Sequence, residues 1–157
     1  MKRMLTAFLA LLLTLTFLAG CTEKQEIVID TDTLSSSLSA LYGGGAVELA
    51  ELSKESYDIR YGLDGLYVSL YAEASIVVTS DEFIVLEAEN EANAKKAFEV
   101  IDTYRKERAK LFKSYAPDEV PKLEGALLSR AGRYVVFASA PDDIVKEATR
   151  IWKEKKG

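Results

Sequence analysis

Glu82-Phe83-Ile84-Val85-Leu86-Glu87-Ala88, followed at residues 91–114 by EANAKKAFEVIDTYRKERAKLFKS, is the most regular pattern in this chain of 157 residues. The first segment is a short apolar run rich in β-branched and aromatic side chains, which is typical of a strand. The second repeats apolar side chains at helical spacing, and Arg108 contributes its aliphatic stem to that apolar face. Asn90 suits the start of a helix, and Pro117 prevents its continuation. The pattern predicts a strand followed by a long amphipathic helix.

The same order of elements returns downstream. When the chain is shifted on itself, Phe83–Leu86 aligns with Tyr134–Phe137, and the helical patterns that follow then align without a gap. A strand at residues 66–73 precedes the first unit, and a strand at residues 126–130 joins the second through the Ala131-Gly132 turn. The alternative is that any two strand-then-helix units align apolar residue to apolar residue.

A hairpin followed by a helix, repeated twice, predicts an α+β fold. Its simplest form is a two-layer sandwich: a four-stranded antiparallel sheet with the two long helices on one face. The second long helix begins at Pro141, and its apolar face consists of Ile144, Val145, Ala148, Ile151 and Trp152.

Short helices are expected to precede the sheet. Asp32 is suited to cap one of them, whose apolar positions are Leu34, Leu38 and Leu41. Ser53 is suited to cap another, with Tyr57 and Tyr61 on one side and Gly62 at its end. The length suits a single domain, expected over residues 32–157.

The N-terminus has the layout of a secretory signal. Lys2 and Arg3 precede an apolar stretch from Met4 to Phe17, which is short for a membrane span. Leu18-Ala19-Gly20-Cys21 closes this stretch and resembles the lipobox of bacterial lipoproteins. The alternatives are an uncleaved anchor helix, or a plain signal peptide followed by an incidental cysteine.

The lipobox resemblance implies a signal peptide at residues 1–20, lipid on Cys21 and a short polar leash over residues 21–31. Cys21 is the only cysteine of the chain, and it stands at the one position that this lipidation needs. The protein is therefore expected on the outer face of the bacterial cytoplasmic membrane, or in the outer membrane if the source has one. Two or more acyl chains hold a protein durably where one does not.

The composition excludes several kinds of chemistry. The chain has no histidine, which removes Ser-His-Asp and Cys-His catalysis and the usual His/Cys metal sites. Without residues 1–20 the chain has 18 basic against 25 acidic residues, a net charge of −7, so no nucleic-acid partner is expected. Asp30-Thr31-Asp32 lacks the glycine and glutamate of a calcium loop, and we expect no metal and no cofactor.

The chain is not expected to be an enzyme, although one alternative stays open. Two carboxylates can divide acid and base roles when their environments separate their pKa values. Glu73 and Glu82, near Tyr71, are the residues that a carboxylate-based hydrolase or transferase would use.

Both faces of the expected sheet are apolar, but two helices on one side cover only one of them. The uncovered face would form an aromatic groove for a ligand or partner, because tyrosine suits wet interfaces. The residues of this candidate binding face are Tyr57, Tyr61, Tyr67, Tyr71, Phe83 and Tyr134. The alternative is that the N-terminal helices cover it.

Several segments resemble a family of small bacterial lipoproteins known as domain of unknown function 4358. They are Tyr61-Gly62-Leu63-Asp64, Asp81-Glu82-Phe83, the helix after Asn90, Leu123-Glu124-Gly125-Ala126 and Gly132-Arg133-Tyr134. The resemblance covers roughly residues 34–152. It implies the lipid anchor and a compact envelope domain, and it implies no reaction and no catalytic residues.

Together these features predict a lipid-anchored extracytoplasmic lipoprotein that acts as a small binding or adaptor domain of the cell envelope. Its expected partners are the membrane, through the lipid on Cys21, and an envelope protein or surface ligand. A purely structural or assembly role is a further alternative, which would require a self-complementary surface.

Overall fold

The computed structural model describes residues 26–43 and 48–157 of the chain. Its centre is an open antiparallel sheet of five strands in the order β1-β2-β3-β5-β4. These are β1 (Leu49–Glu51), β2 (Ser69–Ser75), β3 (Glu82–Glu87), β4 (Leu127–Ala131) and β5 (Tyr134–Ser139). The α+β class is confirmed, but the expected sheet of four strands is wrong because β1 adds a fifth. With three residues, β1 is too short to give a periodic signal in the sequence.

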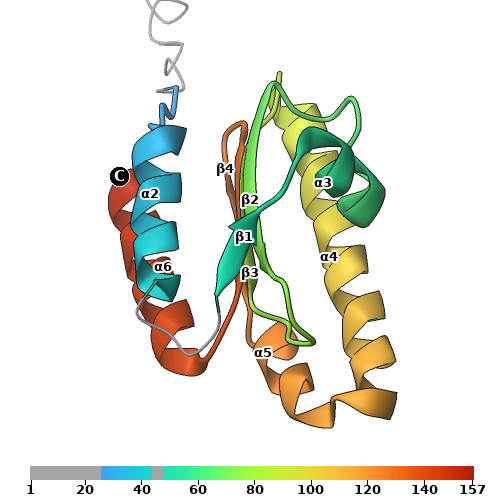
Figure 1. Ribbon diagram of the computed structural model, residues 1–157. Helices are drawn as coiled ribbons and strands as arrows, with labels where there is room; N and C mark the ends of the chain where they lie inside the picture. Colours follow the sequence, from blue (N-terminus) through green and yellow to red (C-terminus); the bar gives the residue numbers. More distant parts are fainter. Residues whose placement is uncertain (1–25, 44–47) are drawn as a thin grey trace, which may run out of the picture.

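Helices cover both faces of this sheet (Figure 1). On one face lie α2 (Thr31–Tyr42) and α6 (Asp142–Lys155), and on the other lie α3 (Lys54–Tyr61), α4 (Glu91–Tyr115) and α5 (Val120–Glu124). A short 3₁₀ turn, η2 (Pro117–Glu119), joins α4 to α5. The architecture is therefore a three-layer sandwich, and the expected two-layer arrangement with both long helices on one face is wrong. None of the helices in residues 26–43 and 48–157 is long and apolar enough to cross a membrane.

The helices begin and end where polar side chains or glycine satisfy the backbone. Asp30, in place of the expected Asp32, caps α2 by accepting a hydrogen bond from the Thr33 amide. Ser53 caps α3, and Gly62 ends it in the left-handed conformation with a φ of 72°. Asn90 caps α4, as its position before the helical pattern predicts.

The two faces of the sheet bury separate cores. Ile84 and Leu86 of β3 pack with α3, α4 and α5, while Phe83 and Val85 pack with α2 and α6. Successive residues of a strand point to opposite faces, so a strand that is buried on both sides is apolar throughout. This explains the unbroken apolar run of β3.

The helices that follow the two repeated hairpins pack on opposite faces of the sheet. The second unit leaves the sheet one residue later than the first, and this difference of one residue explains the change of face. Ala88 is the last buried residue before α4 and lies in the α4-side core, whereas Ala140 is the last before α6 and lies in the α6-side core. In the aligned repeat, Ala88 corresponds to Ser139, so the second unit stays extended for one residue more. β5 ends at Ser139, and Pro141 disfavours the helical conformation for Ala140, so the chain turns into α6 only after Ala140. Each added residue reverses the face from which the chain leaves the sheet.

Candidate functional site

The six residues of the expected aromatic face do not lie on one surface. They divide between the two cores: Tyr57, Tyr61 and Tyr67 pack on the α3–α4 side, and Tyr71, Phe83 and Tyr134 on the α2–α6 side. Residues before Ser69 are outside β2, so the strand alternation assumed from residue 66 onward does not apply to Tyr67. Cys21, the expected lipidation site, lies outside the described residues.

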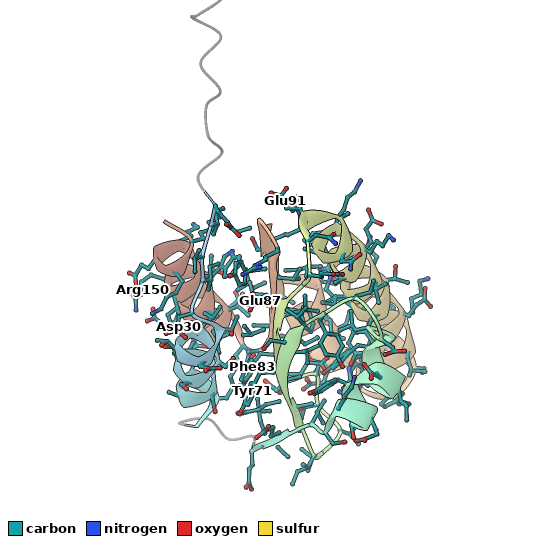
Figure 2. The ribbon with its side chains drawn as sticks, turned by 90° about the horizontal axis from the view of Figure 1, so that it is seen from above. Asp30, Tyr71, Phe83, Glu87, Glu91 and Arg150 are labelled. Carbon is teal, nitrogen blue, oxygen red and sulfur yellow. The ribbon has the colours of Figure 1, made fainter. Side chains whose placement is uncertain are left out.

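Helix α2 covers the sheet face on which a groove was expected. Figure 2 shows Tyr71 and Phe83 on the side of the sheet that faces α2. The ring of Tyr42, at the end of α2, stacks on Phe83 at a centroid distance of 5.5 Å, and its hydroxyl donates to the Glu82 and Ser139 carbonyl oxygens. The alternative to an open groove was cover by the N-terminal helices, and of these only α2 lies on this face, together with α6, whereas α3 packs on the other face.

The two carboxylates of the enzyme alternative point to opposite faces of the sheet. Glu73 is the neighbour of Phe83 across the strand pair, and it accepts a hydrogen bond of 2.7 Å from the Tyr71 hydroxyl on the α2 side. Glu82 precedes Phe83 in the same strand and therefore faces α4. The two acids do not converge on a common site.

Glu82, which has no solvent exposure, is instead the centre of a polar network whose arginines are partly exposed. Arg60 of α3 donates to its Oε2 atom from Nη2 at 2.9 Å and from Nε at 3.2 Å. The hydroxyls of Tyr61 and Tyr104 each donate to the same oxygen at 2.9 Å. The Nε atom of Arg108 lies 3.6 Å from Oε1, so α3, α4 and β3 meet at this one carboxylate.

The charges of this network do not cancel. Two guanidinium groups face one carboxylate, and the tyrosines stay neutral because burial and Glu82 raise the pKa of Tyr61 and of Tyr104. Burial alone disfavours the charged form of Arg60, but the attraction of Glu82 outweighs it and keeps the pKa of Arg60 above its usual value. The cluster therefore retains one excess positive charge, carried by two partly buried arginines.

Polar groups just before Glu82 bind the β2–β3 turn to the next elements of the chain. The amide and hydroxyl of Ser80 donate to the Glu119 carboxylate at 2.7 Å and 2.9 Å. Lys122 of α5 donates to Asp81 at 2.8 Å and to Glu119 at 3.1 Å. Ser80 and Asp81 are buried, as Glu82 is, so three consecutive polar residues each bind a different part of the helical layer.

The turn held in this way exposes apolar side chains. Ile76, Val77 and Val78 are 69%, 59% and 68% exposed. Arg108 donates to the Thr79 carbonyl oxygen at 2.9 Å, which ties the turn to α4. Helical spacing places two further exposed apolar residues on the Arg108 side of α4, and we define the distal patch as Ile76, Val77, Val78, Leu111 and Tyr115.

The distal patch lies far from the start of the described chain. Glu26 lies beside Asn90 and Gly132, at the end where α4 begins. The β2–β3 turn lies toward the opposite end, beside α5 and the C-terminal half of α4 (Figure 1). We call the end that carries the turn the distal end.

Acidification is expected to loosen the distal end. Burial alone would raise the pKa of Glu119, but hydrogen bonds from Ser80 and Lys122 outweigh it and lower this pKa below its usual value of 4.5. The ionised carboxylate thus stabilises the folded chain at neutral pH, and this stabilisation is lost as the pH falls through the lowered pKa. We expect urea unfolding to give a smaller loss of stability between about pH 7 and about pH 3 for Glu119→Gln than for the wild type. An equal loss in the two proteins would contradict this assignment.

The sequence contained a signal for the Glu82 network. Glu82 has the same strand phase as Ile84 and Leu86, and Arg108 stands on the apolar face of its helix. Two opposite charges on two faces that must be buried together predict an internal ion pair. The apolar pattern by itself places only the stem of Arg108 in the core and leaves Glu82 as a candidate acid. Within the described residues there is no group of three or more acidic, histidine or cysteine side chains that could hold a metal ion.

The comparison with known proteins gives one match, to a protein family. No curated protein and no solved structure matches the chain significantly. A family model described as a domain of unknown function, DUF4358, matches residues 48–140, which is more than half of the chain. The matched region contains the whole sheet, α3, α4 and α5, and thus every member of the Glu82 network. The chain belongs to the DUF4358 family.

Proposed function

We propose that this chain is a lipid-anchored binding or adaptor domain of the bacterial cell envelope, which docks a protein partner through the distal patch. The proposal rests on one observation. The β2–β3 turn combines two features that lower the stability of the folded chain. Ile76, Val77 and Val78 are exposed, and the turn that exposes them is fixed by buried polar groups. A large exposed apolar patch on a soluble domain is typical of an interaction surface.

The buried polar groups around Glu82 and the β2–β3 turn support a docking role, because burying them costs the folded chain free energy. Removing ionised groups from water costs several kcal/mol for each ion, and ion pairing offsets this only when the geometry is good. A solvated loop with no function needs no such support. Holding the turn in one conformation lowers the entropy that a partner must remove when it binds.

The position of the distal patch favours a protein partner over the bilayer that would hold the anchor. Helix α4 has 25 residues, so the two ends of the domain lie about 37 Å apart at 1.5 Å per residue. From Cys21 to Glu26 an extended chain spans at most about 18 Å. A net charge of −7 for the chain without residues 1–20 also opposes adhesion to anionic lipid.

Photo-crosslinking in the intact cell tests the docking site. A benzophenone amino acid is placed at position 77, and in a second variant at position 59. Val77 and Ile59 are both exposed aliphatic residues, but Ile59, which is 86% exposed, lies on α3 and outside the distal patch. We expect position 77 to give one discrete protein adduct and position 59 to give none, because only the distal patch is a contact surface.

The identity of the adduct separates the alternatives. A crosslink between two copies of this chain would replace the adaptor role by self-assembly, and a crosslink to lipid alone would overturn the protein partner. The same adduct from both positions would show random collision. Incorporation of labelled fatty acid into the wild type but not into Cys21→Ala tests the anchor separately.

A further inference from the structure

A shallow pocket, which is widely open to solvent, lies between α3 and α4 on the outer side of the Glu82 network. Arg60, Tyr61 and Tyr104 of the network form part of its wall, and Leu66 and Val100 add apolar surface. The remaining lining residues are Gly62, Lys96, Glu99 and Thr103.

The surroundings of this pocket carry excess positive charge. Arg60 and Arg108 together exceed the single charge of Glu82, which lies behind the pocket wall. Lys96 adds a cation to the lining, and the charge of Glu99 is shared with Lys95, whose Nζ atom lies 4.0 Å away. The pocket therefore favours a negatively charged group.

The guanidinium group of Arg60 is already fixed in position before such a group binds. Its Nη2 atom donates to Glu82, and its Nε atom donates to Glu82 and to the Tyr104 hydroxyl. These bonds fix the guanidinium plane, which also lies over the Tyr61 ring at 5.6 Å. Nη1 is the nitrogen that these contacts leave to a ligand. A charged donor fixed in advance loses little entropy when it binds.

We infer that the α3–α4 pocket binds a small amphipathic anion, with its acidic group between Lys96 and Arg60 and its apolar body against Leu66 and Val100. The apolar wall selects against a bare inorganic anion, since such an ion leaves this surface wet. The positive charge selects against a neutral apolar molecule. This site is independent of the distal patch and does not depend on the proposed docking.

Fluorine NMR with three probes tests this inference on the full chain in phosphatidylcholine nanodiscs. The probes are 4-(trifluoromethyl)phenylacetate, its neutral alcohol analogue, and trifluoroacetate, which is an anion without an apolar body. We expect saturable broadening of the first probe only, with empty nanodiscs as the blank. Equal binding of the neutral analogue would overturn the role of charge, and no saturable binding of the first probe would overturn the site.

An exposed lysine on the other side of the sheet provides a control. Lys96 lines the pocket, whereas Lys146 is exposed on α6, which packs on the opposite face of the sheet. We expect Lys96→Ala to weaken binding of the aromatic acid about tenfold, as for the loss of one charge-assisted hydrogen bond, and Lys146→Ala to leave it unchanged. Val100→Trp should abolish binding by filling the pocket, and Val77→Ser in the distal patch should not affect it. Equal effects of the two lysine variants, or unchanged binding in Val100→Trp, would overturn the inference.

Discussion

Glu82→Gln is expected to lower the free energy of unfolding by about 3–5 kcal/mol, a large part of the stability of an ordinary domain. The carboxylate is fully buried and receives hydrogen bonds from Arg60, Tyr61 and Tyr104. Glutamine keeps the shape but removes the negative charge, so the two partly buried guanidinium groups of Arg60 and Arg108 lose their shared counter-charge. Urea unfolding of the purified full chain measures the loss.

Two further variants show whether charge is the cause. Glu99 lies on α4 with a side chain that is 63% exposed, and Glu99→Gln should change stability by no more than about 0.5 kcal/mol. Removing Arg108 together with Glu82 returns the cluster to the excess of one positive charge that it has in the wild type, so the double variant should lose less than the two single variants added together. Strict additivity, or an equal loss in Glu99→Gln, would contradict the assignment.

The second large effect is expected for Trp152→Ala, which should lower stability by about 3–5 kcal/mol. Trp152 of α6 is 1% exposed and packs in the core on the α2 side of the sheet. Its indole N–H donates to the Ser129 hydroxyl of β4 at 2.9 Å. Truncation thus removes both a large buried surface and the donor for that hydroxyl.

Double-variant cycles with Trp152→Ala also test the three-layer arrangement. Ser129 touches the indole, whereas Phe112 of α4 lies in the core on the other face. We expect Trp152→Ala to be non-additive with Ser129→Ala and additive with Phe112→Ala, because contacting residues couple and separated ones do not. Strong coupling between Trp152 and Phe112 would mean that the two long helices share one core.

Much of this fold is predictable because local signals agree with the final structure. The strand beginning at Glu82 and the helix from Glu91 are found where period and capping place them. The β4–β5 hairpin turns at Gly132, whose φ of 54° suits glycine. The strand expected at residues 66–73 begins three residues later, at Ser69, because Leu66 and Tyr67 continue the apolar pattern without being part of the sheet.

The faces of the helices were not predictable from the apolar pattern. A helix that is amphipathic packs equally well on either side of a sheet that is apolar on both sides. The face that α6 covers depends on whether the chain leaves the sheet before or after Ala140. Pro141 favours the later exit. The candidate aromatic face depended on that choice, and α2 covers the sheet surface on which it was expected.

The distal patch was not predictable from the sequence for a different reason. Ile76, Val77 and Val78 form an apolar run, and such a run predicts burial in a strand. In the structure this run forms the turn itself, and the pairing of β2 with β3 ends before it, at Ala74 and Glu82. The residues that fix the turn come from α4, η2 and α5, which no local pattern connects to it.

The claim on which this account depends is that the buried polar groups present the distal patch to a partner. The most direct test compares photo-crosslinking from position 77 in the wild-type background and in Glu119→Gln, which removes the negative charge and leaves one acceptor oxygen in place of the two that bind Ser80 and Lys122. Glu124→Gln, an exposed change in the neighbouring helix α5, is the matched control. At equal protein level, the account predicts a clearly lower yield of adduct in Glu119→Gln and an unchanged yield in Glu124→Gln. An unchanged yield in Glu119→Gln, or no adduct in the wild type, would contradict it.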